Sequence, residues 1–196
     1  MTTVSPPASV AVLDSAITWA HGCLQTARTS DLNLPTPCAA WDLGELLAHM
    51  EDSLEALGEA AEVGRVRVTD RPQQADPGRT IDRLVQRACA IRAAWLHRPT
   101  SAPINVGDLA LGRDTLAMVG ALEIAVHGWD VARAVGADLD LPEDLALRLY
   151  PVAVAVVTPD DRGSRFADSG RQRKGARSPA CRSLTSGASR ESHWPH

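Results

Sequence analysis

A carboxylate and a histidine stand four residues apart in an apolar segment of this chain. Glu123 is the only acidic residue between Leu116 and Trp129, and His127 follows it after one helical turn. A spacing of four places both side chains on one face of a helix. Because the segment is apolar nearly all round, we expect the helix to be buried in a bundle. An unpaired buried carboxylate is costly, and a bound cation would remove that cost.

A second histidine supplies the best third ligand. His49 lies in Leu46–Met50, on an earlier amphipathic segment that also predicts a helix. Two imidazoles and one carboxylate suit Zn²⁺, although Ni²⁺, Fe²⁺ and Mn²⁺ accept the same donors. Three protein ligands leave coordination positions open, so His49, Glu123 and His127 predict a metal site for chemistry or ligand capture.

Several neighbours of these ligands could support such a site. Asp130 and Asp52 each follow a histidine by three residues and could fix an imidazole tautomer, although a surface or interhelix position suits them equally. Trp41 is expected to pack an end of the bundle, with a pocket wall as the alternative. Arg133 could meet an anionic substrate, but a structural ion pair is favoured. Cys38 is expected to be a small packed residue.

Five helical segments must position these residues. Apolar residues recur at helical spacing, and proline, glycine and polar runs separate the segments. The pattern predicts an all-α fold with four longer helices and an additional short helix. The expected helices cover residues 8–28, a segment capped by Asp42 and extending to Leu57, Ile81–Trp95, a segment capped by Asp114 and ending near Gly136, and a short helix from Pro142 toward Val157. Residues 64–78 and 99–113 are expected to be loops.

Charge divides the chain into two parts. The 196 residues carry a net charge of −4, but residues 162–196 contain eight Arg and Lys against two acids, or +6, which leaves −10 on residues 1–161. We therefore expect one metal-binding helical domain over residues 1–161 and a basic tail over residues 162–196. The tail has few large apolar side chains, so we expect it to be disordered. An acidic domain does not favour nucleic acid.

Other features of the sequence bear on the cell compartment. The N-terminus lacks the basic and apolar regions of a signal peptide, and no apolar run is long enough to span a bilayer. We expect a cytoplasmic protein without a membrane partner. Four scattered cysteines form no Cys-x-x-Cys pair, which indicates neither a disulfide framework nor a zinc knuckle.

Two longer motifs contain all three candidate ligands. Residues 35–49 read PTPCAAWDLGELLAH, and residues 123–136 read EIAVHGWDVARAVG. Together, in this order and at this separation, they resemble the mycothiol-dependent maleylpyruvate isomerase N-terminal-like family of actinobacteria, which belongs to the DinB/YfiT-like metal-binding four-helix bundles. The resemblance covers roughly residues 8–160.

The resemblance implies an up-down four-helix bundle with an additional short helix and with a divalent metal at one end, held by His49, Glu123 and His127. It also implies a low-molecular-weight thiol, mycothiol, as cosubstrate, and a transferase or isomerase-like reaction on a small electrophile. Elementary chemistry agrees, because a metal-bound thiol is deprotonated near neutral pH and becomes a usable nucleophile.

Two other functions stay open at this point. One is a non-catalytic metal-binding or stress-associated protein, which could be a homodimer through an exposed bundle face. The other is a regulatory or nucleic-acid-binding module acting through the basic tail. We also hypothesise that a reading-frame change near codon 168 replaced the native C-terminus, since the chain turns Arg- and Ser-rich there. An undisturbed frame with the same tail in close relatives would refute this hypothesis.

Overall fold

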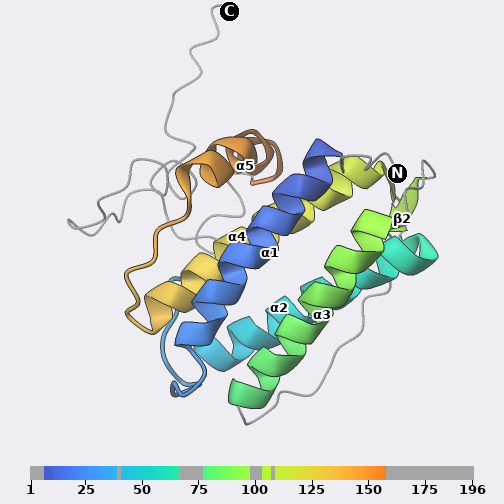
Figure 1. Cartoon of the computed structure of the whole chain (residues 1–196). Coiled ribbons are helices and arrows are strands. Elements are labelled where there is room, and N and C mark those ends of the chain that lie inside the picture. The colour runs from blue at the N-terminus through green and yellow to red at the C-terminus, as the bar shows by residue number, and fades with distance from the viewer. Residues whose placement is uncertain (1–6, 39–40, 67–76, 98–102, 107–108, 158–196) are drawn as a thin grey trace, which may run out of the picture.

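Helices dominate the computed structural model, which describes residues 7–38, 41–66, 77–97, 103–106 and 109–157 (Figure 1). The all-α fold expected from the sequence is confirmed. Within the described part of the chain, the helices are α1 (Ala8–Thr26), α2 (Leu43–Val63), α3 (Pro77–His97), α4 (Arg113–Ala134) and α5 (Glu143–Val156). The expected disorder of residues 162–196 lies outside the described residues.

Helices α2 and α3 lie side by side and run in the same direction. Arg83 forms a two-pronged ion pair with Glu51, both N···O distances being 3.0 Å, and the Trp95 indole donates to the carbonyl of Leu57 at 3.3 Å. Contacts therefore advance along both helices together.

Helices α1 and α4 form the second parallel pair and pack most closely. The Ser9 hydroxyl donates to Asp114 at 2.5 Å near their N-terminal ends, and Gly128 lies against Ala20 farther along. A Cβ built on Gly128 would stand 2.9 Å from the Ala20 Cβ, so this crossing requires glycine. Because α2 is parallel to α3 and α1 is parallel to α4, the directions of the helices depart from a simple up-down order, in which successive helices alternate.

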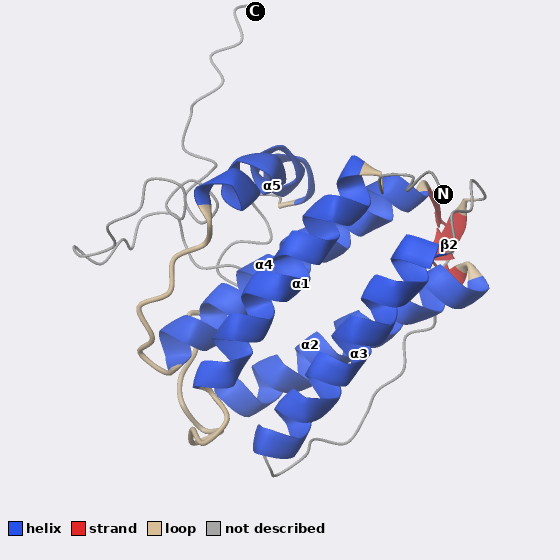
Figure 2. Cartoon of the chain, viewed as in Figure 1, coloured by secondary structure: helices blue, strands red, loops and turns tan. Residues whose placement is uncertain are grey.

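Three short strands join the bundle where the sequence suggested loops. They are β1 (Arg65–Val66), β2 (Ile104–Val106) and β3 (Leu109–Leu111), and Figure 2 shows them beside the ends of α2 and α3. β1 pairs with β2 in parallel, and β2 pairs with β3 antiparallel. Strands of two or three residues are too short to give a periodic signal, which explains why the loop expectation for these residues was wrong.

Helix ends follow local chemistry, with one correction. Asp42 caps α2 as predicted: its carboxylate accepts from the Glu45 amide at 2.8 Å, and Glu45 accepts from the Asp42 amide at 3.0 Å. The predicted cap at Asp114 is wrong, because Gly112 is the N-cap of α4 and the Asp114 carboxylate instead accepts from Ser9 of α1. No helix in the described ranges is long and apolar enough to cross a membrane.

Candidate metal centre

Two helices bring the three predicted ligands together. α2 supplies His49 from its N-terminal half, and α4 supplies Glu123 and His127 from adjacent turns. The Glu123 Oε2 atom lies 3.1 Å from His127 Nε2 and 3.9 Å from His49 Nε2. One ligand atom from each residue falls within 4.8 Å of the other two. The structure therefore brings together the three residues that the sequence selected, and their role as metal ligands stays a prediction.

The spacing of these atoms fits a divalent cation. Two ligands that are each about 2.1 Å from a zinc ion stand about 3.4 Å apart at the tetrahedral angle. The 3.1 and 3.9 Å separations lie on either side of that value. The donor set, two imidazole nitrogens and one carboxylate oxygen, is typical of a site that keeps a coordination position open. The residues present could hold such an ion with small side-chain adjustments.

His127 is oriented from behind by a second carboxylate. Its Nδ1 atom lies 3.2 Å from Oδ2 of Asp130, and both residues are buried on α4. Because the Asp130 carboxylate accepts the Nδ1 proton, the Nε2 atom faces Glu123 with its lone pair available when the imidazole is neutral. Asp130 thus occupies the supporting position that the sequence offered as one of two alternatives. Asp52, the other candidate, is half-buried on α2.

Electrostatics couple the Glu123, His127 and Asp130 side chains on α4. Burial would lower the pKa of His127, but hydrogen bonds to Asp130 and Glu123 and their negative charge raise it to about 9. Burial would raise the pKa of Glu123, yet hydrogen bonds from His127 and His49, with their positive charge, hold it well below its ordinary value. Burial raises the pKa of Asp130, although His127 opposes that shift. Without a metal, the arrangement favours an imidazolium between two carboxylates.

Trp41 lies against both histidines. Its ring centroid is 4.5 Å from that of His49 and 5.8 Å from that of His127, and the two imidazoles meet edge to face with centroids 4.9 Å apart. The residue stands just before the Asp42 cap, so the start of α2 fixes its position. The tryptophan therefore forms part of the site wall, which the sequence offered only as the alternative to packing a bundle end.

Other sequence expectations concern residues beside the ligands. Cys38 is buried, as expected for a packed residue. Arg133 is structural: it donates to the carbonyl of Ala137 at 2.5 Å, just beyond the end of α4, and lies 5.8 Å from the centre of the Trp129 ring. Glu123 differs from the expectation of a fully buried acid, because 34% of its side chain is exposed, against 8% for His127. That exposure indicates an accessible site.

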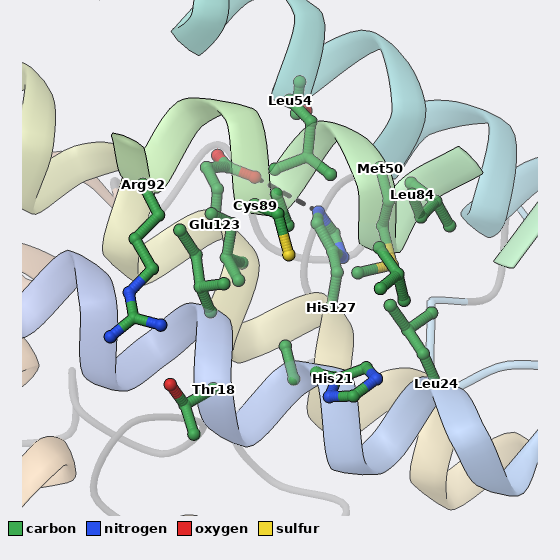
Figure 3. Close-up of a pocket in the computed structure, with 16 residues that line it drawn as sticks. Thr18, His21, Leu24, Met50, Leu54, Leu84, Cys89, Arg92, Glu123 and His127 are labelled. Carbon is green, nitrogen blue, oxygen red and sulfur yellow. Dashed lines mark ion pairs between the residues drawn. The ribbon is translucent and has the colours of Figure 1, made fainter. Parts of the chain in front are cut away.

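A pocket explains why Glu123 is accessible. Side chains of α1, α2, α3 and α4 line it, and Figure 3 shows Glu123 and His127 among them. Its volume is about 230 Å³. Its lining is mostly apolar, from side chains that the sequence assigned to the core, such as Met50 and Leu54. No sequence pattern predicts this cavity, because an apolar stripe looks the same whether neighbouring side chains fill the space or leave it open.

Comparison with known families agrees with this geometry. A family model described as the mycothiol maleylpyruvate isomerase N-terminal domain matches residues 14–132, more than half of the chain. The chain belongs to that family. The match to the mycothiol maleylpyruvate isomerase N-terminal domain includes all three ligands, and it confirms the resemblance drawn from the two motifs.

The relatives found are similar to this chain in sequence and are themselves uncharacterized. An uncharacterized protein of Mycobacterium tuberculosis, from strain CDC 1551 / Oshkosh and from strain ATCC 25618 / H37Rv, is 31% identical over 153 residues. The match covers 74% of this chain and 78% of the relative. No solved structure matches the chain.

Proposed function

We propose that this protein binds a divalent metal ion, Zn²⁺ by ligand softness, through His49, Glu123 and His127. We further propose that the site activates a low-molecular-weight thiol such as mycothiol to attack a small electrophile. The observation that carries the proposal is the convergence of two imidazoles and a carboxylate within 4.8 Å, beside a pocket that Glu123 and His127 line. The mycothiol in the family's description supports the choice of thiol.

The chemistry that a bound cation supplies is acidity, since coordination lowers the pKa of a thiol enough to form the thiolate near neutral pH. The protein's own side chains orient the ligands and limit the access of water. Asp130 holds the Nδ1 proton of His127 and so keeps its Nε2 atom directed at Glu123. The apolar pocket wall excludes water from the sulfur and from the carbon that it attacks.

Metal content tests the first half of the proposal. Elemental analysis of protein purified without an affinity tag should find one Zn²⁺ per chain. His49→Ala, Glu123→Ala and His127→Ala should each lose it, because two remaining ligands hold a divalent ion poorly. Glu143→Ala, which removes an exposed carboxylate on α5, is the control and should keep the metal. Wild-type protein that stays metal-free after reconstitution would refute the site.

Product analysis tests the second half. Metal-loaded protein with mycothiol and chlorodinitrobenzene should form the thioether, in which a sulfur–carbon bond replaces the carbon–chlorine bond and chloride leaves. The rate should fall to the uncatalysed level in Glu123→Ala. A metal-loaded wild type that gives no turnover with a series of electrophiles would overturn the proposed transferase activity and support a non-catalytic metal-binding protein.

A further inference from the structure

The pocket beside the candidate metal ligands has an exposed mouth and a buried floor. Its exposed lining residues come from α1 and α3 and include Thr18, His21, Cys89 and Arg92. Its buried lining residues come from all four long helices, and His127 lies among them. A molecule that enters between α1 and α3 therefore passes an exposed rim and reaches Glu123 and His127 at depth (Figure 3).

The charge in this pocket is already balanced before any ligand enters. Arg92 is the only Arg or Lys among the described lining residues, and its guanidinium forms an ion pair with Asp14. Its Nη2 atom donates to Asp14 Oδ2 at 3.2 Å, while Nε contacts the other carboxylate oxygen. Glu123 adds a carboxylate on the opposite side, from α4. His127, which is also cationic when no metal is bound, is already paired on both sides, with Glu123 at 3.1 Å and Asp130 at 3.2 Å. An anionic group would therefore meet only cations in the described lining, Arg92 and His127, that a carboxylate already pairs.

The rest of the wall favours an apolar body. The lining is dominated by aliphatic side chains and one thioether: Ile17, Ala20, Leu24, Met50, Leu54, Leu84, Val85, Ala88 and Ile124. An apolar cavity of about 150 Å³ accepts benzene. The volume of about 230 Å³ is therefore sufficient for a benzene ring with a small substituent.

We propose that the electrophile of this protein is a small, uncharged molecule with an apolar body the size of a substituted benzene, bound between α1 and α3 with its reacting end toward Glu123 and His127. This inference deepens the proposed function and rests on it, because only the proposed thiol reaction makes the bound molecule an electrophile. It also separates this chain from a dicarboxylate substrate such as the maleylpyruvate in the family's name, because the one guanidinium in the described pocket lining, that of Arg92, is already paired with Asp14.

Ligand binding by ¹⁹F NMR tests the proposal directly. Fluorobenzene and 4-fluorobenzoate would be titrated into the full-length protein, both as purified and after chelation of metal. In the chelated protein, we expect fluorobenzene to bind at least about tenfold more tightly, because the carboxylate would lose its hydration without gaining a partner. Equal or tighter binding of the benzoate there would overturn the proposal, as would an absence of fluorobenzene binding.

Matched variants locate the binding. Ala88→Leu places three more carbons in the pocket and should weaken fluorobenzene binding by about tenfold or more. Ala90→Leu makes the same change at an exposed position on α3 that does not line the pocket, and it should bind as the wild type does. Equal affinity in the two variants would place the ligand elsewhere and refute the proposal.

A charge variant tests the argument independently of packing. Asp14→Asn releases Arg92 from its ion pair, so 4-fluorobenzoate should gain several-fold in affinity while fluorobenzene changes little. Unchanged benzoate affinity in folded Asp14→Asn protein would contradict the charge balance proposed here. These readouts need no metal, so a failure of the metal proposal would appear in elemental analysis and a failure of the pocket proposal in NMR.

Discussion

At the scale of single residues, the candidate centre depends on how three charges on α4 share a proton or a metal. Glu123 and Asp130 lie on either side of the His127 ring, 3.1 and 3.2 Å from its two nitrogens. One carboxylate faces the pocket, whereas the other is buried. Because of this difference in exposure, Glu123 is the candidate ligand and Asp130 the supporting group, although both are acids on the same helix.

Replacing the supporting carboxylate should weaken metal binding without removing a ligand. Asp130→Asn keeps the size of the side chain but removes the charge that holds the Nδ1 proton of His127, so we expect a 10- to 100-fold loss of Zn²⁺ affinity. Competition with a chromogenic chelator measures the change. Asp144→Asn, an exposed substitution in the first turn of α5, should keep wild-type affinity. An unaltered affinity in Asp130→Asn would contradict the orientation argument.

The raised pKa of His127 predicts a pH dependence of the metal-free protein. A folded-state pKa of about 9, above the usual 6.5, stabilises the fold fully below pH 6.5, and this stabilisation is lost as the pH rises through 9. Its full value is up to about 3 kcal/mol. The melting temperature of chelated protein should fall between pH 6.5 and 9, and the fall should be much smaller in His127→Gln. A wild-type melting temperature that rises over this window would contradict the charge assignment.

At the scale of elements, the distance between α1 and α4 depends on a residue without a side chain. Gly128 follows His127 directly, so the same turn of α4 carries a candidate ligand and the closest approach to α1. The backbone of Ala20 is the obstacle there, since a Cβ on Gly128 would stand 3.1 Å from its Cα. Backbone atoms cannot move aside as a flexible side chain can.

Gly128→Ala should therefore destabilise the protein although alanine favours helices. We expect a loss of about 1–3 kcal/mol in the free energy of unfolding, because α1 and α4 must separate. Gly22→Ala on α1 is the matched control: nothing lies within 4 Å of its Cβ, and it should gain about 0.5–1 kcal/mol. Denaturant unfolding of both variants measures the difference. Equal stabilisation by both substitutions would refute the close packing.

At the scale of the whole molecule, the candidate site is contained in the four long helices and the turn before α2. The metal ligands and the pocket lining lie between Ile17 and His127, inside the matched residues 14–132. Helix α5 packs on α4 and α1 and contributes no residue to the pocket lining. None of the three candidate ligands lies in the basic residues 162–196.

Removing residues 162–196 should therefore leave the site intact. The truncated protein is expected to keep one metal per chain and the affinity of the full chain for fluorobenzene, because every group that the two proposals use remains. Elemental analysis and the ¹⁹F titration measure both quantities. A truncated protein that folds but loses its metal would show that the tail contributes to the site.

Helix positions and the choice of candidate ligands were predictable from local chemistry. The spacing of Glu123 and His127 follows from helix geometry alone, and Asp42 caps α2 through atoms three residues apart. The His49 assignment used a second motif and its family resemblance. Helix spacing and caps can be predicted from the sequence because they depend on residues that are close along the chain. The candidate ligands can be predicted because histidine and glutamate are seldom placed together on an apolar helix for structural reasons alone.

The parallel course of α2 and α3, the ring of Trp41 against both histidines and the pocket could not be derived in this way. Each depends on the distance between segments that are remote in sequence, and one apolar stripe is compatible with several packings. Whether Asp114 caps α4 or accepts from Ser9 was decided by the arrival of α1 beside it. Local physics thus selects the helices and the candidate ligands, whereas close packing between helices determines which side chains face a cavity.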